Sequence, residues 1–162
     1  MWEMTKYICF SLLLLLFLNG CIPSNNVSED IFQFKDSYVG DNNTVGSIVR
    51  QLPNGEHSEG FELKTKEEPF GMVLKYGDIE ATMIDDAIKE TVIYNATFIF
   101  ALVKNADWIT FDFGEQKHTL TKEELQDWYG KELASYTNEE DLSKVTQEYL
   151  EDESKINQFF EK

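Results

Sequence analysis

Hydrophobic residues first recur at helical spacing after residue 44. Between residues 45 and 52 the apolar positions fall at i, i+3, i+4 and i+7, which places them on one face of a helix: Val45, Ile48, Val49 and Leu52. Residues 41–43 (Asp-Asn-Asn) offer an N-cap side chain, and residues 53–55 (Pro-Asn-Gly) are typical of a helix end. The pattern therefore predicts a helix that ends before Pro53.

Two pairs of segments alternate between apolar and polar residues, as strands with one buried face do. The first pair comprises residues 61–65 and 70–76, joined by residues 66–69 (Lys-Glu-Glu-Pro). The second pair comprises residues 108–113 and 116–120, which flank a Gly-Glu turn. Each pair predicts a β-hairpin.

A long apolar helix is predicted between these hairpins, from about residue 85 to about residue 105. Residues 92–103 are nearly all apolar, so we expect this helix to lie in the core. One face is formed by Ile84, Ile88, Val92, Asn95, Phe98, Ile99, Leu102 and Val103.

Helical patterns continue to the end of the chain. Residues 121–124 (Thr-Lys-Glu-Glu) form a capping box, which predicts a helix that carries Leu125, Trp128, Tyr129 and Leu133. The last segment is amphipathic and acidic, and its spacing allows one long helix or two short ones. Its apolar positions are Leu142, Val145, Tyr149, Ile156, Phe159 and Phe160.

The predicted order of elements is α-β-β-α-β-β-α-α. Two hairpins and their flanking helices indicate an α+β domain, in which a small antiparallel sheet packs with the central apolar helix and has helices on one face. No repeat or internal linker divides the chain after residue 30, so we expect one domain over residues 31–162.

The N-terminus differs from the rest of the chain. Residues 7–18 carry no charge and follow Lys6, as in the hydrophobic region of a signal peptide, and they are too few to span a bilayer comfortably. Residues 18–21 (Leu-Asn-Gly-Cys) come next and resemble the lipobox of bacterial lipoproteins.

The resemblance implies that residues 1–20 are removed and that Cys21 receives a diacylglycerol and fatty acids such as palmitate. Residues 21–30 would then be the lipidated end and a polar tether, and the domain would lie on the outer face of the cytoplasmic membrane. An ordinary cleaved signal or a short uncleaved anchor is the alternative.

Composition limits the chemistry that the chain can perform. The 162 residues include 14 Lys and Arg against 30 Asp and Glu, a formal net charge of −16, which argues against binding to nucleic acid. The two cysteines are Cys9, within the signal region, and Cys21. A mature chain with a lipidated Cys21 would have no thiol for catalysis, disulfides or zinc.

Short motifs after residue 37 match the pattern of one family. They are residues 38–42 (Tyr-Val-Gly-Asp-Asn), Val45, residues 52–53, residues 61–65 and 68–71 (Glu-Pro-Phe-Gly), Asn95-Ala96, Leu102-Val103, Asn105, Ile109 and Phe111. Over roughly residues 32–113 the chain resembles domain-of-unknown-function family 4825 of Gram-positive bacteria. Members look like lone lipoproteins or extracytoplasmic parts of membrane proteins, which implies an outward-facing sensing or interaction module. The resemblance supplies no catalytic residues.

Candidate metal and catalytic sites are weak. His57 and His118 are the only histidines, and no zinc motif contains them. Residues 41–46 begin like a calcium loop, but Leu52 stands where that loop needs a bidentate Glu, so a helix cap is the better interpretation. No nucleophile motif or phosphate-binding loop is present in the sequence. We expect no metal, no cofactor and no enzymatic activity.

Three residues are candidates for contact with a ligand or partner. Trp128 and Tyr129 are adjacent on one predicted helix, so at least one is expected near the surface. Asn95 is polar on an apolar face, so its buried amide needs hydrogen-bond partners. We expect these partners to be groups of the protein itself in preference to a ligand. The leading hypothesis is a tethered module that acts through a membrane or envelope protein. The alternative is an accessory domain that binds a small envelope molecule.

Overall fold

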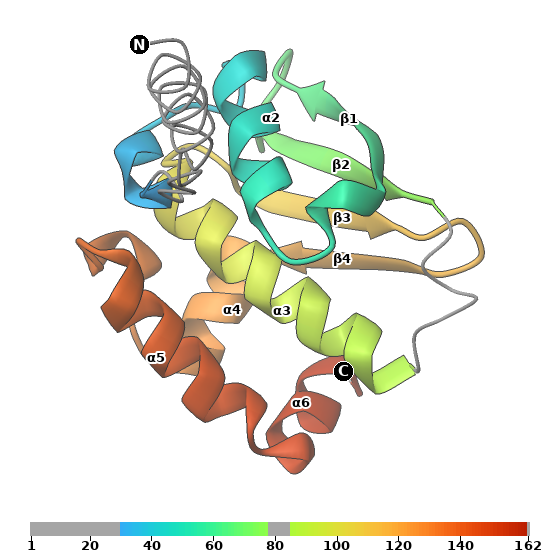
Figure 1. Cartoon of the computed structure of the whole chain (residues 1–162), viewed down its shortest axis with the longest axis vertical. Helices are drawn as coiled ribbons and strands as arrows, with labels where there is room; N and C mark the ends of the chain where they lie inside the picture. The colour runs from blue at the N-terminus through green and yellow to red at the C-terminus, as the bar shows by residue number, and fades with distance from the viewer. Residues whose placement is uncertain (1–29, 78–84, 162) are drawn as a thin grey trace, which may run out of the picture.

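The computed structural model of the chain describes residues 30–77 and 85–161. The predicted signal peptide and Cys21 lie outside the described residues, as does the tether up to residue 29. The described part has three layers: a four-stranded sheet, the long helix α3 (Asp85–Leu102), and helices from the C-terminal part of the chain (Figure 1). Among the described residues, no helix is both long and apolar enough to cross a membrane.

The strands lie in the order β1 (Ser58–Lys64), β2 (Gly71–Tyr76), β3 (Trp108–Asp112) and β4 (Lys117–Thr121). Pairs β1–β2 and β3–β4 are antiparallel, which confirms both predicted hairpins. The central pair β2–β3 is parallel, so the expectation of a purely antiparallel sheet is corrected. The reason is α3, which separates the hairpins and acts as the crossover connection that parallel strands require.

The first predicted helix is α2 (Asn42–Gln51), and its cap is Asp41. The Asp41 carboxylate accepts hydrogen bonds from the Thr44 backbone N–H at 3.2 Å and from the Thr44 hydroxyl at 2.6 Å. Both carboxylate oxygens are therefore used in the cap, which confirms the preferred interpretation of residues 41–46.

The predicted capping box opens α4 (Lys122–Tyr129): the Thr121 side chain accepts from the Glu124 backbone N–H, and Glu124 accepts from the Thr121 backbone N–H. The helix ends at Tyr129, earlier than Leu133, which lies in the short 3-10 turn η3 (Leu133–Ser135). Gly130 follows in a left-handed conformation and ends the helix.

The acidic C-terminal segment forms two helices, α5 (Glu139–Leu150) and α6 (Glu153–Phe160). Asp152 separates them, because its side chain accepts hydrogen bonds from the backbone N–H groups of Ser154 and Lys155 and so caps a new helix. Two further 3-10 turns, η1 (Ile31–Phe34) and η2 (Gly55–His57), flank α2.

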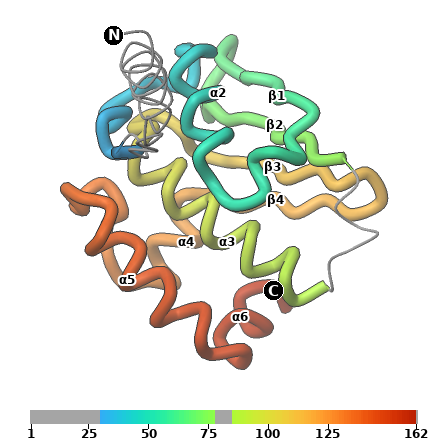
Figure 2. The backbone as a smooth tube through the Cα atoms, viewed as in Figure 1, coloured from blue at the N-terminus to red at the C-terminus, as the bar shows by residue number. Residues whose placement is uncertain are grey.

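Helix α3 is buried along most of its length, as predicted, and runs between the sheet and the C-terminal helices (Figure 2). The inner sheet face supplies Met72, Leu74, Ile109, Phe111 and Leu120 to the same core. The outer face is polar, with Glu62 bound to Lys64 and Lys75 at 2.7 and 2.6 Å. Helices thus cover one face of the sheet, and the opposite face meets solvent.

The hairpin turn between β1 and β2 is fastened to the start of β3. Asp107 accepts a hydrogen bond from the Phe70 backbone N–H at 2.7 Å, and the Trp108 indole N–H donates to the Pro69 carbonyl at 3.0 Å. A Cβ atom on Gly71 would overlap the indole ring of Trp108 and its carbonyl oxygen. Gly71 is therefore required for the indole to lie against the strand.

The variant Gly71→Ala should lower the free energy of unfolding by about 1–3 kcal/mol, because Trp108 must shift to admit the methyl group. Urea unfolding followed by circular dichroism measures the change. Gly40→Ala is the control, since no atom of the described residues lies within 4 Å of a Cβ at that position. Equal stability of the two variants would contradict the packing described above.

Candidate interaction groove

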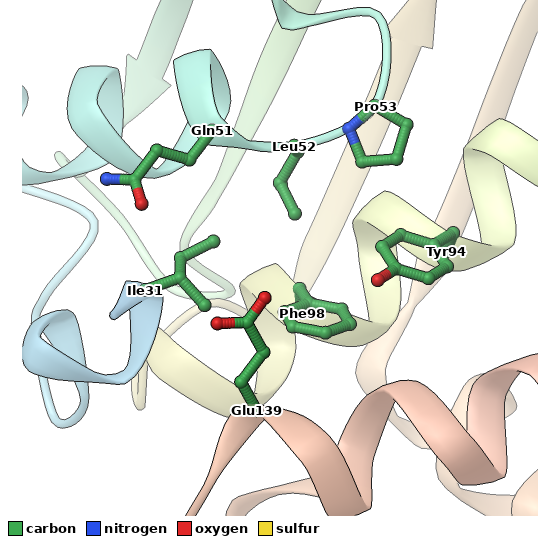
Figure 3. Close-up of a pocket in the computed structure, with 7 residues that line it drawn as sticks. All are labelled: Ile31, Gln51, Leu52, Pro53, Tyr94, Phe98 and Glu139. Atoms are coloured by element: carbon green, nitrogen blue, oxygen red, sulfur yellow. The ribbon is translucent and has the colours of Figure 1, made fainter. Parts of the chain in front are cut away.

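A groove of about 420 Å³ lies where α3 meets three other segments. Figure 3 shows side chains that converge on it from η1, the C-terminal end of α2, α3 and the first turn of α5. The lining residues are Ile31, Gln51, Leu52, Pro53, Tyr94, Phe98 and Glu139.

The groove has an apolar floor and a polar rim. Ile31, Leu52 and Phe98 are almost fully buried and form the floor. Gln51 and Glu139 are exposed, and Figure 3 shows the Glu139 carboxylate directed into the space between Ile31 and Phe98. An apolar floor with a few convergent polar groups is the usual composition of a binding site.

Local sequence signals position each wall. Helix α2 stops at Gln51, and Leu52 adopts an extended conformation before Pro53, so the chain turns away and leaves Leu52 above α3. Asn138 caps α5 by accepting from the Asp141 backbone N–H at 2.9 Å, which places Glu139 at the first position of that helix.

The α3 wall is held against α5 by Tyr94. Its ring stacks on Phe98 with ring centroids 4.8 Å apart, and its hydroxyl lies 3.1 Å from the Ser143 hydroxyl. The Gln51 amide and the Glu139 carboxylate make no side-chain hydrogen bond or ion pair with any described residue. These two rim groups are available to an incoming molecule.

Asn95 lies next to this wall, in the interior of the domain. Its amide nitrogen donates to the Pro53 carbonyl at 3.0 Å and to the Tyr76 hydroxyl at 3.3 Å. Burial raises the pKa of Tyr76 to about 12, opposed in part by the Asn95 hydrogen bond. The Asn95 amide nitrogen thus ties α3 to the turn after α2 and to the sheet. The buried Oδ1 of the same amide has no hydrogen-bond partner among the described residues.

Trp128 and Tyr129 lie in an aromatic cluster outside the groove. The Tyr129 hydroxyl lies 3.0 Å from the Thr97 hydroxyl, and burial raises the pKa of Tyr129 to about 12. Trp128 is partly exposed and packs edge-on against Tyr149. The structure therefore does not bring the three predicted contact residues together in one place, and their role toward a partner stays a prediction.

The two histidines lie at opposite edges of the sheet. His57 precedes β1, whereas His118 lies on β4, and strands β2 and β3 lie between these two edges. His118 faces the core, where its ring meets the edges of Phe113 and Phe160. This separation prevents the pair from sharing a metal ion, and the described residues contain no group of three metal-binding side chains.

A second hollow lies beside the β1–β2 turn. It has a volume of about 730 Å³ and is bordered by Trp108 and by lysines and glutamates of the turn. The Trp108 indole already packs on Gly71 and bonds Pro69, so its polar edge is engaged. The groove near Phe98 is the stronger candidate because it combines a buried apolar floor with unengaged polar groups.

Sequence reasoning missed the groove because its residues come from four separate segments. Leu52 and Phe98 were expected on apolar helix faces, but no local pattern indicated that the end of α2 would meet the start of α5. Glu139 belongs to the acidic last segment of the sequence, but that pattern did not distinguish it from the neighbouring acidic residues.

A family model described as "Domain of unknown function (DUF4825)" matches residues 31–125, more than half of the chain. The chain belongs to this family. Six of the seven groove residues fall inside the matched span, and Glu139 lies beyond it. No curated protein and no solved structure matches the chain significantly.

The burial of His118 predicts a pH-dependent stability. Desolvation lowers the pKa of His118 below its usual 6.5, with Asp85 opposing the shift and Lys89 adding to it. The unfolded chain therefore binds a proton more readily, so stability is lost as the pH falls below about 6.5, by no more than about 1.4 kcal/mol per pH unit.

Urea unfolding at pH 7.5, 6.5 and 5.5 measures this loss. The variant His118→Gln should lose less stability than the wild type over this range, whereas His57→Gln, which alters an exposed histidine, should retain the wild-type slope. An unchanged slope in His118→Gln would show that other groups cause the dependence.

Proposed function

We propose that this chain is a lipid-anchored protein on the outer face of the cytoplasmic membrane, and that its domain is a non-enzymatic interaction or sensing module. The observation that carries the proposal is the order of the N-terminal segments. An uncharged stretch at residues 7–18 leads directly to residues 18–21 (Leu-Asn-Gly-Cys), and a short polar segment then leads to the domain.

The position of the groove supports this proposal. Ile31 lines the groove and stands at the start of the domain, directly after the predicted tether. Residues 22–30 span no more than about 30 Å when fully extended. A lipid on Cys21 would therefore hold the groove within reach of other proteins at the membrane surface.

The charge of the chain limits the kinds of surface that it can bind. A net charge of −16 repels nucleic acid and anionic lipid and attracts basic surfaces. Two polar residues that the sequence singled out make structural hydrogen bonds: Asp41 caps α2, and the Asn95 amide nitrogen donates to the Pro53 carbonyl. The Gln51 and Glu139 side chains on the groove rim are therefore the groups that we expect to contact a partner.

A second candidate function is an accessory domain that binds a small envelope molecule. The groove volume of about 420 Å³ falls in the range of small-ligand sites, which favours this alternative. A ligand of this kind would raise the melting temperature of the protein, because binding to the folded state alone stabilises it.

The variant Cys21→Ala tests the anchor. Without the thiol no diacylglycerol can be attached, so the protein should accumulate as uncleaved precursor or be released from the cells. Fractionation, immunoblotting and metabolic labelling with an alkyne analogue of palmitate measure the outcome, and Cys9→Ala is the matched control that should stay lipidated. Equal membrane retention of the Cys21→Ala protein, with its signal removed, would contradict the proposal.

A further inference from the structure

Among the described residues that line the groove, Glu139 carries the one formal charge and none is basic. The nearest basic residue along α2 is Arg50, whose guanidinium donates to the Ser47 hydroxyl at 3.1 Å and borders a different hollow beside Gly46. Asp30 precedes Ile31, and Glu140 follows Glu139, so the flanking charges are also negative. An anionic group would be repelled from this site.

This negative charge argues against two occupants of the groove. The chain's own residues 22–30 include Glu29 and Asp30 and no basic residue, so they do not complement Glu139. A second copy of a chain with a net charge of −16 would be repelled as a whole. A molecule that complements this groove would carry a positive charge beside an apolar group.

Resting on the proposed function, we infer that the groove binds a lysine or arginine side chain of a partner polypeptide, together with an adjacent apolar residue. The cation would pair with the Glu139 carboxylate and donate to the Gln51 amide oxygen, both of which border the groove (Figure 3). Its aliphatic stem and the neighbouring apolar side chain would cover the floor of Ile31, Leu52 and Phe98.

The shape of the groove favours a polypeptide over a free amine. Gln51, Pro53 and Glu139 are exposed, so the rim continues onto the open surface instead of closing around a ligand. Small-molecule sites bury most of the ligand surface. An isolated amine would leave the apolar floor of this groove uncovered. In a polypeptide, a second residue next to the lysine or arginine covers that floor.

The test uses the full-length lipidated protein in a non-ionic detergent and saturation-transfer NMR, which detects weak binding on the peptide signals. The probe is the peptide Gly-Leu-Lys-Leu-Gly. One control peptide replaces the lysine with norleucine, and another replaces both leucines with serine. The expected result is transfer to the lysine methylenes and leucine methyls of the probe, with weaker binding of each control peptide.

Glu139→Gln and Glu140→Gln form a matched pair, since each removes one exposed carboxylate from the first turn of α5 and only Glu139 lines the groove. Glu139→Gln should weaken binding of the probe about three- to fivefold, as expected for one solvent-exposed ion pair, and Glu140→Gln should change it less than twofold.

Four outcomes would overturn the inference. They are no transfer to the lysine peptide, equal binding of the norleucine peptide, equal weakening by both glutamine variants, and full displacement of the probe by equimolar butylamine, which would identify a free amine as the ligand. Each leaves the lipid anchor intact, whereas retention of cleaved Cys21→Ala protein in membranes defeats the proposed function itself.

Discussion

The burial of α3 between the sheet and the C-terminal helices constrains the rest of the structure. A helix enclosed on two sides must be apolar nearly all around, and each polar group that it retains needs a partner on a neighbouring segment. Asn95 reaches the Pro53 carbonyl, Thr97 meets the Tyr129 hydroxyl, and the Thr91 hydroxyl accepts from the Asn54 amide. These contacts hold the turn after α2 and the end of α4 against α3.

The groove is a consequence of the same arrangement. The chain turns away after Gln51, and α5 approaches α3 from the other side through Tyr94 and Ser143. The space between them is floored by Phe98 of α3 and rimmed by Gln51 and Glu139, which are exposed. The packed core therefore presents a small groove that carries one negative charge, on Glu139, and that is lined by Ile31 at the start of the domain.

The parts of the fold that depend on local chemistry were predictable from the sequence. The caps at Asp41 and Thr121 and both hairpins involve residues close together in the chain, so their spacing reveals them. Asp152 is also a local signal, since it caps a new helix, but the apolar spacing around it suited one helix as well as two.

What depends on distant segments was not predictable. The parallel pairing of β2 with β3 depends on which strands α3 brings together, and the predicted order of elements left that pairing open. Likewise, Asn95 stood out as polar on an apolar face, but its partners, Pro53 and Tyr76, come from other elements. Glu139 and Ile31 line the same groove although more than a hundred residues separate them in the sequence. The spacing of apolar residues gives no information about contacts over such a separation.

Site-specific photocrosslinking in intact cells tests most directly whether the protein acts through this groove. A photoreactive amino acid at position 51, on the groove rim, is compared with the same residue at position 119, which is exposed on the outer face of the sheet. The expected result is one membrane or envelope protein crosslinked from position 51 alone, through a segment that contains lysine or arginine beside an apolar residue. Crosslinking of the same protein from both positions, or from position 119 alone, would contradict a role for the groove.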